Sequence, residues 1–266
     1  MSLLSKYDPY NTSLCNSENK EYYLSTGCSN LDEFLKGGLF RRGITQIYGA
    51  SGIGKTQLAL QLCLTAQIRS NSLEEICGAA YICTEAAFPS SRLKELLEKS
   101  PIVKKHPNVT DEMIFIEHIT NTEDLEGCIF NPDRLSQLLS KHKIRLLIID
   151  SIAATYRVEY EADSVQKRAK SLRHIGYRLH QLASLHSMAV VCLNQVTAII
   201  GNSSLESVST KEQPSLGITW ANLVTNSFYM YKRCNRRYFY VAGSSYLPCK
   251  SIEYEIVEFG LRALKF

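Results

Sequence analysis

Residues 49–56 read Gly49-Ala50-Ser51-Gly52-Ile53-Gly54-Lys55-Thr56 and fit the phosphate-loop pattern GxxxxGK[ST] at every defined position. The preceding residues, Ile44 to Tyr48, are short, apolar and rich in β-branched side chains, which is typical of a buried parallel strand. The following residues, Leu58 to Ala66, are largely apolar and predict a well-buried helix. A strand, a glycine loop and a helix in this order give the motif its mechanism and disfavour a chance glycine-rich turn. The sequence therefore predicts a site for a nucleoside triphosphate.

Each part of the loop has a chemical task in such a site. Glycines allow successive backbone N–H groups to turn inward and surround phosphate oxygens. The N-terminus of the following helix adds the positive end of its dipole. We expect Lys55 to reach the β- and γ-phosphates and the Thr56 hydroxyl to coordinate Mg²⁺.

Length and composition limit the classes of protein to consider. The 266 residues suffice for one large α/β domain. We expect residues 1–23, which are polar and show no period, to be a flexible segment, and residues 24–266 to form the domain. Nine cysteines without a CxxC pair, and no signal peptide, indicate reduced thiols inside the cell. No apolar run is long enough to span a bilayer, so we expect no membrane association.

Strand and helix signals alternate along the chain after the phosphate loop. We expect strands at residues 79–84, 113–119, 146–150 and 189–195, and helices at 29–35, 90–98 and 164–186. Asn131-Pro132 is typical of a helix start and predicts a helix through Leu139. Residues 201–214 are polar and irregular, and from Trp220 onward the sequence predicts consecutive antiparallel strands. This order indicates an α/β fold with a mixed, mostly parallel sheet flanked by helices and C-terminal antiparallel hairpin strands.

Three polar residues stand at the carboxyl ends of predicted strands, where ligands bind in open α/β sheets. Asp150 occupies the position of a carboxylate that supports Mg²⁺ beside Thr56; the alternative is a strand-end aspartate that caps a turn. Glu85 can orient and deprotonate water for attack on a γ-phosphate, unless it is an ordinary loop glutamate. Gln195 can sense the γ-phosphate through its amide, although polar residues commonly end buried strands.

The long predicted helix carries an unbalanced charge. Between Ser164 and Ser187 it contains no acidic residue and five basic ones: Lys167, Arg168, Lys170, Arg173 and Arg178. A solvated helix usually mixes both signs. Together with Arg157 in the preceding loop, this face suits a nucleic-acid backbone or an acidic partner protein.

A second basic cluster occupies a predicted hairpin turn. Lys232-Arg233 and Arg236-Arg237 stand on either side of the turn, and Tyr238 follows them. Basic and aromatic residues interleave in nucleic-acid sites, but basic residues in an exposed turn often serve only to keep the protein soluble.

These motifs, taken together, resemble the RecA-type recombinase family and in particular its eukaryotic recombinase paralogues. The motifs that carry the resemblance are, in chain order, Thr26-Gly27-Cys28 with Leu31-Asp32 and Gly37-Gly38, the phosphate loop closing on Gln57, Tyr81 to Glu85 with Phe88-Pro89 and Arg92-Leu93, Leu147 to Ala154, Asn194 to Thr197, and Pro214 to Asn222.

The resemblance implies a RecA-like P-loop NTPase core that binds ATP and Mg²⁺ and acts in homologous recombination and double-strand break repair. The implied catalytic residues are Glu85, Lys55 and Gln195, and the implied metal ligands are Thr56 and Asp150. The implied nucleotide-binding residues are Gly49, Ala50, Ser51, Gly52, Ile53, Gly54, Lys55, Thr56, Gln57 and Asp150. The expected DNA contacts are Arg157, Lys167, Arg168, Lys170 and Arg173, with loops near 157–164 and 200–216 facing DNA.

Partners and activity also follow from the resemblance. It implies single-stranded DNA, a sister recombinase paralogue and the main recombinase as partners, and the nucleus as the location. Ala50 and Gln46 replace glutamates that are common in the family, so we expect slow DNA-dependent ATP hydrolysis that can require a partner protomer. The alternative is a non-catalytic scaffold clamped by ATP, whose basic helix binds protein. A ring-forming motor would need a further domain.

Overall fold

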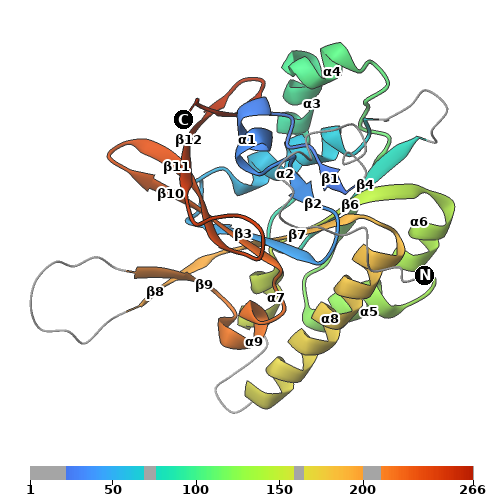
Figure 1. The fold of residues 1–266 in the computed structure, drawn as a ribbon. Helices are drawn as coiled ribbons and strands as arrows, with labels where there is room; N and C mark the ends of the chain where they lie inside the picture. Colours follow the sequence, from blue (N-terminus) through green and yellow to red (C-terminus); the bar gives the residue numbers. More distant parts are fainter. Residues whose placement is uncertain (1–21, 69–75, 159–164, 200–210, 266) are drawn as a thin grey trace, which may run out of the picture.

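The computed structural model describes residues 22–68, 76–158, 165–199 and 211–265. A nine-stranded sheet with the order β13-β12-β11-β10-β3-β7-β6-β4-β5 forms its centre (Figure 1). The strands, in chain order, are β3 (Ile44–Gly49), β4 (Cys77–Cys83), β5 (Ile114–His118), β6 (Lys143–Asp150), β7 (Ala189–Asn194), β10 (Asn226–Arg233), β11 (Arg236–Ser244), β12 (Ser251–Val257) and β13 (Gly260–Ala263). Strands β3 to β7 pair in parallel, β10 joins β3 in parallel, and β11 to β13 follow antiparallel. The predicted fold class is confirmed.

Helices cover both faces of this sheet. They are α1 (Ser29–Phe34), α2 (Lys55–Thr65), α3 (Ser90–Lys99), α4 (Pro101–Lys105), α5 (Thr122–Phe130), α6 (Leu135–Lys141), α7 (Ile152–Val158), α8 (Val165–Leu185) and α9 (Gly217–Ala221). In Figure 1, α1 to α4 lie above the sheet, and α5, α7, α8 and α9 lie below it. Small two-stranded sheets pair β1 (Tyr23–Leu24) with β2 (Leu39–Phe40), and β8 (Val196–Ile199) with β9 (Lys211–Pro214).

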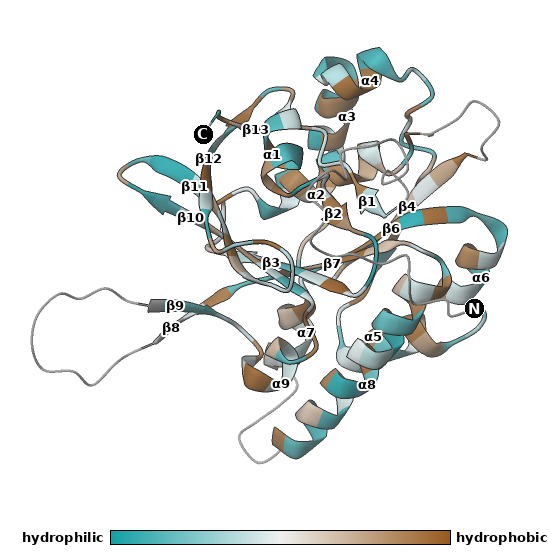
Figure 2. Ribbon diagram, viewed as in Figure 1, coloured by the Kyte–Doolittle hydropathy of each residue, from teal (hydrophilic) through white to brown (hydrophobic). Residues whose placement is uncertain are grey.

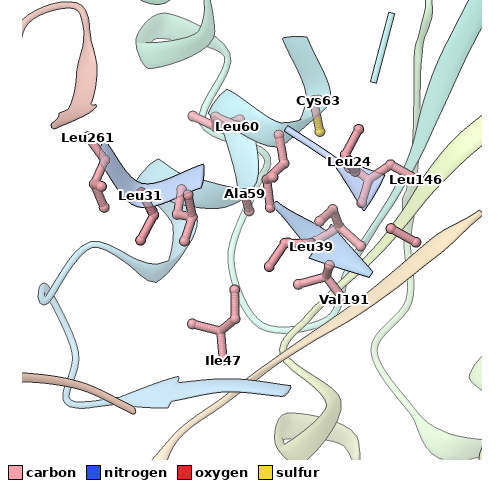
Figure 3. Close-up of a cluster of buried hydrophobic side chains, with 14 of the residues drawn as sticks. Leu24, Leu31, Leu39, Ile47, Ala59, Leu60, Cys63, Leu146, Val191 and Leu261 are labelled. Carbon is pink, nitrogen blue, oxygen red and sulfur yellow. The ribbon is translucent and has the colours of Figure 1, made fainter. Parts of the chain in front are cut away.

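Alternation of side chains along the strands produces two cores, one on each face. The first core joins α1 to α4 to the sheet, and Figure 3 shows part of it: Leu24, Leu31, Leu39, Ile47, Ala59, Leu60, Cys63, Leu146, Val191 and Leu261. The second core joins α5 to α9 to the opposite face and includes Leu147, Ile149, Leu172 and Trp220. Helix α2 is buried from Leu58 through Thr65, as its apolar sequence predicts. The end of the β10–β11 hairpin is hydrophilic (Figure 2).

Several element boundaries differ from those predicted. Asn131 does not start a helix; it ends α5, and its Oδ1 accepts a hydrogen bond from Asp133 N in the turn that leads to α6. Trp220 lies in the short helix α9, and residues 211–214 form β9. Arg157 lies in α7 rather than in a loop.

The predicted N-terminal segment lies outside the described residues except for its last two, of which Tyr23 pairs with Phe40 in β1 and β2. The predicted DNA-facing loops also fall largely outside the described residues. Among the described helices, none is long and apolar enough to cross a membrane.

Candidate nucleotide-binding site

The phosphate loop connects β3 to α2 and leaves its tip exposed. Gly54 has a φ of +120°, and a Cβ there would lie 2.7 Å from Ile256 Cδ1, so only glycine fits. Gly52 has a φ of +72°, and nothing lies within 4 Å of its Cβ position. The loop thus borders open space beside the first turn of α2. This geometry fits a phosphate group held by backbone N–H groups at a helix N-terminus.

Lys55, the first residue of α2, folds back over the loop. Its Nζ donates hydrogen bonds to the carbonyl oxygens of Gly49, at 2.7 Å, and Ala50, at 2.9 Å. Burial lowers the pKa of Lys55, and the nearby carboxylates of Asp150 and Glu85 oppose this shift. The ammonium group is therefore positioned above the loop by contacts that an incoming phosphate would replace.

The structure brings Thr56 and Asp150 together, although they are 94 positions apart. Thr56 Oγ1 donates to Asp150 Oδ2 at 2.9 Å. Tyr81 OH donates to the same oxygen at 2.7 Å. A hydroxyl and a carboxylate at this distance form the oxygen-rich donor set that Mg²⁺ prefers. Sequence reasoning places Tyr81 in a strand but does not find its contact with Asp150.

Glu85 and Gln195 also meet directly. They follow β4 and β7, which lie on either side of β6 and its terminal Asp150. Gln195 Nε2 donates to Glu85 Oε2 at 2.6 Å, and Glu85 is exposed. The two side chains predicted to touch water and γ-phosphate therefore occupy one end of the sheet, together with Thr56 and Lys55.

A buried hydrogen-bond network supports Gln195 from behind. Asn194 Nδ2 donates to Gln46 Oε1 at 3.0 Å and to the carbonyl oxygen of Ser215 at 2.9 Å. Trp220 Nε1 donates to the same Gln46 oxygen at 2.8 Å, and Ser215 Oγ donates to the carbonyl of Gln195 at 3.0 Å. The network links the end of β7 to α9 and to the residue that follows β9. Sequence reasoning identifies Gln46 only as a replacement for a glutamate.

An open cavity of about 550 Å³ lies next to Gln57, the residue after Thr56. Arg92 crosses this region from α3: its Nε donates to Gln57 Oε1 at 2.8 Å, and its Nη2 donates to the carbonyl of Val257 at 2.7 Å. It also pairs with Glu95. The remaining residues around the cavity are Ile256 and Glu258. The cavity is therefore close enough to the phosphate loop for the rest of a nucleotide to extend into it.

The predicted DNA contacts do not join the nucleotide site. Lys167, Lys170 and Arg173 are exposed on α8, and Arg168 beside them is half-buried. Helix α8 packs on the second core, whereas α2 packs on the first, so the two helices lie on opposite faces of the sheet. Arg157 is in the last turn of α7, and its side chain lies outside the described part of the structure.

The chain is similar to known DNA repair proteins along most of its length. The Rad51 family model matches residues 18–263. The DNA repair protein XRCC3 of Bos taurus is 39% identical over 206 residues, which cover 75% of this chain and 60% of that protein. XRCC3 of Mus musculus is 40% identical over 213 residues, with the same shares covered. An XRCC3 homolog of Arabidopsis thaliana is 28% identical over 283 residues, covering 91% of this chain and 93% of the relative.

The chain thus spans 60% of the length of the two mammalian relatives. Three stretches of this sequence resemble XRCC3: Asn194–Thr197, Pro214–Asn222 and Tyr246-Leu247-Pro248. The identities of 39% and 40% confirm the resemblance of the chain to XRCC3. The family model covers nearly the whole chain, including the phosphate loop and every strand of the central sheet. The chain belongs to the Rad51 family, whose domain has the RecA-like fold.

Proposed function

We propose that this chain is an ATP-dependent DNA-binding factor in homologous recombination and double-strand break repair. It acts in the nucleus as a recombinase paralogue that assists the main recombinase within a heteromeric complex containing a sister paralogue. One observation carries the proposal: Thr56 contacts Asp150, and Glu85 contacts Gln195, at the same end of the sheet in a Rad51-family chain. The names of the relatives, which are DNA repair proteins, support the pathway.

The residues around the loop fit ATP with Mg²⁺. The backbone N–H groups of residues 50–56 and the Lys55 ammonium would hold the phosphates, and Thr56 with Asp150 would hold the metal ion. The bound nucleotide supplies the γ-phosphoryl group. Glu85 would accept a proton from the attacking water. Before nucleotide binds, its hydrogen bond to Gln195 holds the carboxylate at this end of the sheet.

Gln195 connects this chemistry to the rest of the fold. The contact between Gln195 and Glu85 spans two strand ends, and a γ-phosphate that accepts a hydrogen bond from the Gln195 amide would break it. Ser215 donates two hydrogen bonds to the backbone carbonyl of Gln195, one from its N–H and one from its Oγ. A movement of the Gln195 backbone would therefore also move the segment that leads into α9. Nucleotide state is in this way coupled to the segment that the family resemblance predicts to face DNA.

DNA binding is proposed for the basic face of α8. Lys167, Lys170 and Arg173 are exposed there, and the helix contains no acidic residue that would neutralise them. If these groups contact phosphates, log affinity for a single strand should fall linearly with log salt concentration, with a slope of about 0.7 per phosphate neutralised. A scaffold that uses α8 to bind protein would show no salt-dependent affinity for single-stranded DNA.

The test is ATP hydrolysis by the purified chain, alone and with its sister paralogue, with and without single-stranded DNA. We expect Glu85→Gln to retain nucleotide but to lose turnover by about 100-fold or more, the usual contribution of a general base. Glu98→Gln removes the same charge from an exposed position on α3 and should leave turnover unchanged. Nucleotide bound without turnover under every condition would instead support the ATP-clamped scaffold.

A further inference from the structure

The phosphate loop leaves β3 but extends over the strands beside it. Gly49 ends β3, and a Cβ on it would lie 2.2 Å from the carbonyl oxygen of Met230 in β10. Gly54 lies near the other end of the loop, and a Cβ on it would lie 2.7 Å from Ile256 Cδ1 in β12. In the sheet, β10 adjoins β3, and β11 separates β10 from β12. The loop therefore packs on the C-terminal strands, and side chains of those strands lie directly beneath it.

One of these side chains places a polar group against the loop. On β12, Ile252, Tyr254 and Ile256 alternate with glutamates and pack in or against the first core. Tyr254 is 2% exposed, and its hydroxyl donates to the carbonyl oxygen of Ile53 at 2.8 Å. Burial raises the pKa of Tyr254, so the phenol keeps its proton at neutral pH. The hydroxyl is therefore a fixed donor that faces one carbonyl of the loop.

This contact fixes the orientation of a whole peptide unit. The bond between Ile53 and Gly54 is trans, so the unit is planar and its C=O and N–H point in opposite directions. Because the Ile53 carbonyl points into the first core, toward Tyr254, the Gly54 N–H points away from that core, toward the outside of the loop. An N–H on the outside attracts a phosphate oxygen, whereas a carbonyl oxygen there would repel it.

The opposite orientation is open to the backbone. Gly54 has a φ of +120°, a value that is rare for residues with a side chain. Turning the Ile53–Gly54 peptide over would change this angle by about 180°, from +120° to about −60°, which is ordinary for any residue. The hydrogen bonds of Lys55 Nζ end on two earlier carbonyls of the loop and do not hold this peptide, whereas the Tyr254 hydroxyl does.

We propose that Tyr254 is a positioning residue for phosphate binding: its hydroxyl holds the Ile53–Gly54 peptide with the N–H directed at the phosphates of the nucleotide. The inference rests on the proposed function for its ligand and adds a residue that is 201 positions away from the loop carbonyl that it contacts. In the free chain the loop is thereby already in its phosphate-binding form, and a ligand that meets a preformed site binds more tightly. The alternative is that Tyr254 contributes only to the packing of the core.

The test measures binding of ATP and of inorganic tripolyphosphate to the full chain by isothermal titration calorimetry, well below the melting temperature. Tyr254→Phe keeps the ring and removes only the hydroxyl. Its affinity for both ligands should fall about fivefold, the factor that a typical hydrogen bond contributes, because the Gly54 N–H would face the phosphates in only part of the population. A loss seen with ATP but not with tripolyphosphate would overturn the inference, since tripolyphosphate has neither base nor sugar.

Tyr246→Phe is the matched control. Tyr246 also packs against the first core, but within the described part of the chain its buried hydroxyl has no hydrogen-bond partner. Removing that hydroxyl should leave both affinities unchanged, and an equal loss in the two tyrosine variants would overturn the inference. Wild-type affinities in Tyr254→Phe would also overturn it and leave the proposed function standing. A wild-type chain that binds neither ATP nor tripolyphosphate would reject both.

Nuclear magnetic resonance reports on the peptide itself. Labelling isoleucine with ¹³C at the carbonyl and glycine with ¹⁵N selects the amides of the three glycines that follow isoleucine: Gly54, Gly176 and Gly201. In the wild type, tripolyphosphate should shift the Gly54 signal and leave that of Gly176, which lies in α8, in place. In ligand-free Tyr254→Phe, the Gly54 signal should already differ from that of the wild type. An unchanged Gly54 signal in that variant would overturn the inference, because a lower affinity would then arise from weaker packing alone.

Discussion

At the scale of single residues, Asp150 depends on a neighbour outside the phosphate-loop motif. Its Oδ2 receives one hydrogen bond from Thr56 and one from Tyr81. Tyr81 is fully buried, and its pKa is raised, first by burial and then by the charge of Asp150. The phenol therefore keeps its proton, and its hydrogen bond to Asp150, at neutral pH. When the Thr56 hydroxyl turns toward a metal ion, Tyr81 is the contact that still holds this carboxylate oxygen.

Tyr81→Phe should therefore weaken the metal-assisted part of nucleotide binding. A hydrogen bond to a charged group contributes about 1.5–3 kcal/mol, so the Mg²⁺ concentration needed for half-maximal binding of a fluorescent ATP analogue should rise about tenfold or more. Binding in excess chelator should not change. Tyr156→Phe is the matched control, since Tyr156 is equally buried but contacts Ser171 in the second core. An equal rise in both variants would show that weaker packing, rather than the hydrogen bond to Asp150, is responsible.

Sequence patterns locate the residues of the site but not most of the contacts between them. Thr56 belongs to a motif, and Asp150 and Glu85 stand at strand ends, so a parallel sheet brings them to one edge. Tyr81 and Gln46 lie inside strands and belong to no such motif or strand end. Their partners depend on the strand order β3-β7-β6-β4 and on its register, which are set by packing over the whole sheet.

At the scale of elements, a compact turn joins β1 to α1. Asp32 in α1 accepts hydrogen bonds from Thr26 N at 2.6 Å, from Thr26 Oγ1 at 2.7 Å and from Ser25 Oγ. The residue before α1 is Cys28, which provides no side-chain cap. Asp32 instead fixes the turn from inside the helix. The acid thus replaces the missing cap and positions the chain ahead of β3.

Asp32→Ala should destabilise this turn and with it the domain. Thr26 is fully buried, so its N–H would be left without an acceptor, at a cost of about 1–3 kcal/mol. Urea unfolding measures the change. Glu33→Ala removes a neighbouring, exposed acid and should shift stability by less than about 0.5 kcal/mol. Similar losses in the two variants would mean that helix propensity, rather than the hydrogen bonds of Asp32, explains the effect.

The elements most visible in the sequence are those with long, regular patterns. The sequence predicts helix α8 to within a residue or so of its ends, because its apolar stripe recurs at steps of three and four. The prediction that a helix starts at Asn131-Pro132 is wrong, because residues of these types also follow helix ends. Here Asn131 ends α5, and α6 begins only at Leu135. The helix α9 around Trp220 escapes prediction because five residues show no period.

At the scale of the whole molecule, the cysteines report on the integrity of the core. Burial raises the pKa values of the Cys63 and Cys192 thiols, and burial together with Asp150 raises the pKa of Cys83 to about 12. Since the thiolate is the reactive form, these groups stay inert well above neutral pH. Cys234 and Cys249 are exposed.

Iodoacetamide should therefore modify Cys234 and Cys249 in the native protein and spare Cys63, Cys83 and Cys192, even at about pH 8.5. Peptide mass spectrometry measures each site separately. In urea above the unfolding midpoint, all five should react. Modification of Cys63 in the native state at a rate comparable with Cys234 would contradict a closed core around α2.

The phosphate loop is joined to strands near the end of the chain. Tyr254 OH donates to the carbonyl of Ile53 at 2.8 Å, and a Cβ on Gly49 would meet the carbonyl of Met230 at 2.2 Å. Arg92 connects Gln57 to the turn between β12 and β13. A ligand on the loop is thus held by residues from both ends of the sequence, and loop and sheet should unfold together.

Magnesium ATP should consequently raise the melting temperature of the entire domain. A ligand at 100 times its Kd stabilises the native state by about 2.7 kcal/mol, which for a chain of this size corresponds to about 5–10 °C. Differential scanning fluorimetry against nucleotide concentration measures the shift, and circular dichroism at a wavelength reporting the helices should give the same midpoint. Lys55→Ala should abolish the shift while keeping the fold, because its Nζ contacts carbonyls of the loop itself. A shift that persists in Lys55→Ala would place the nucleotide somewhere other than the phosphate loop.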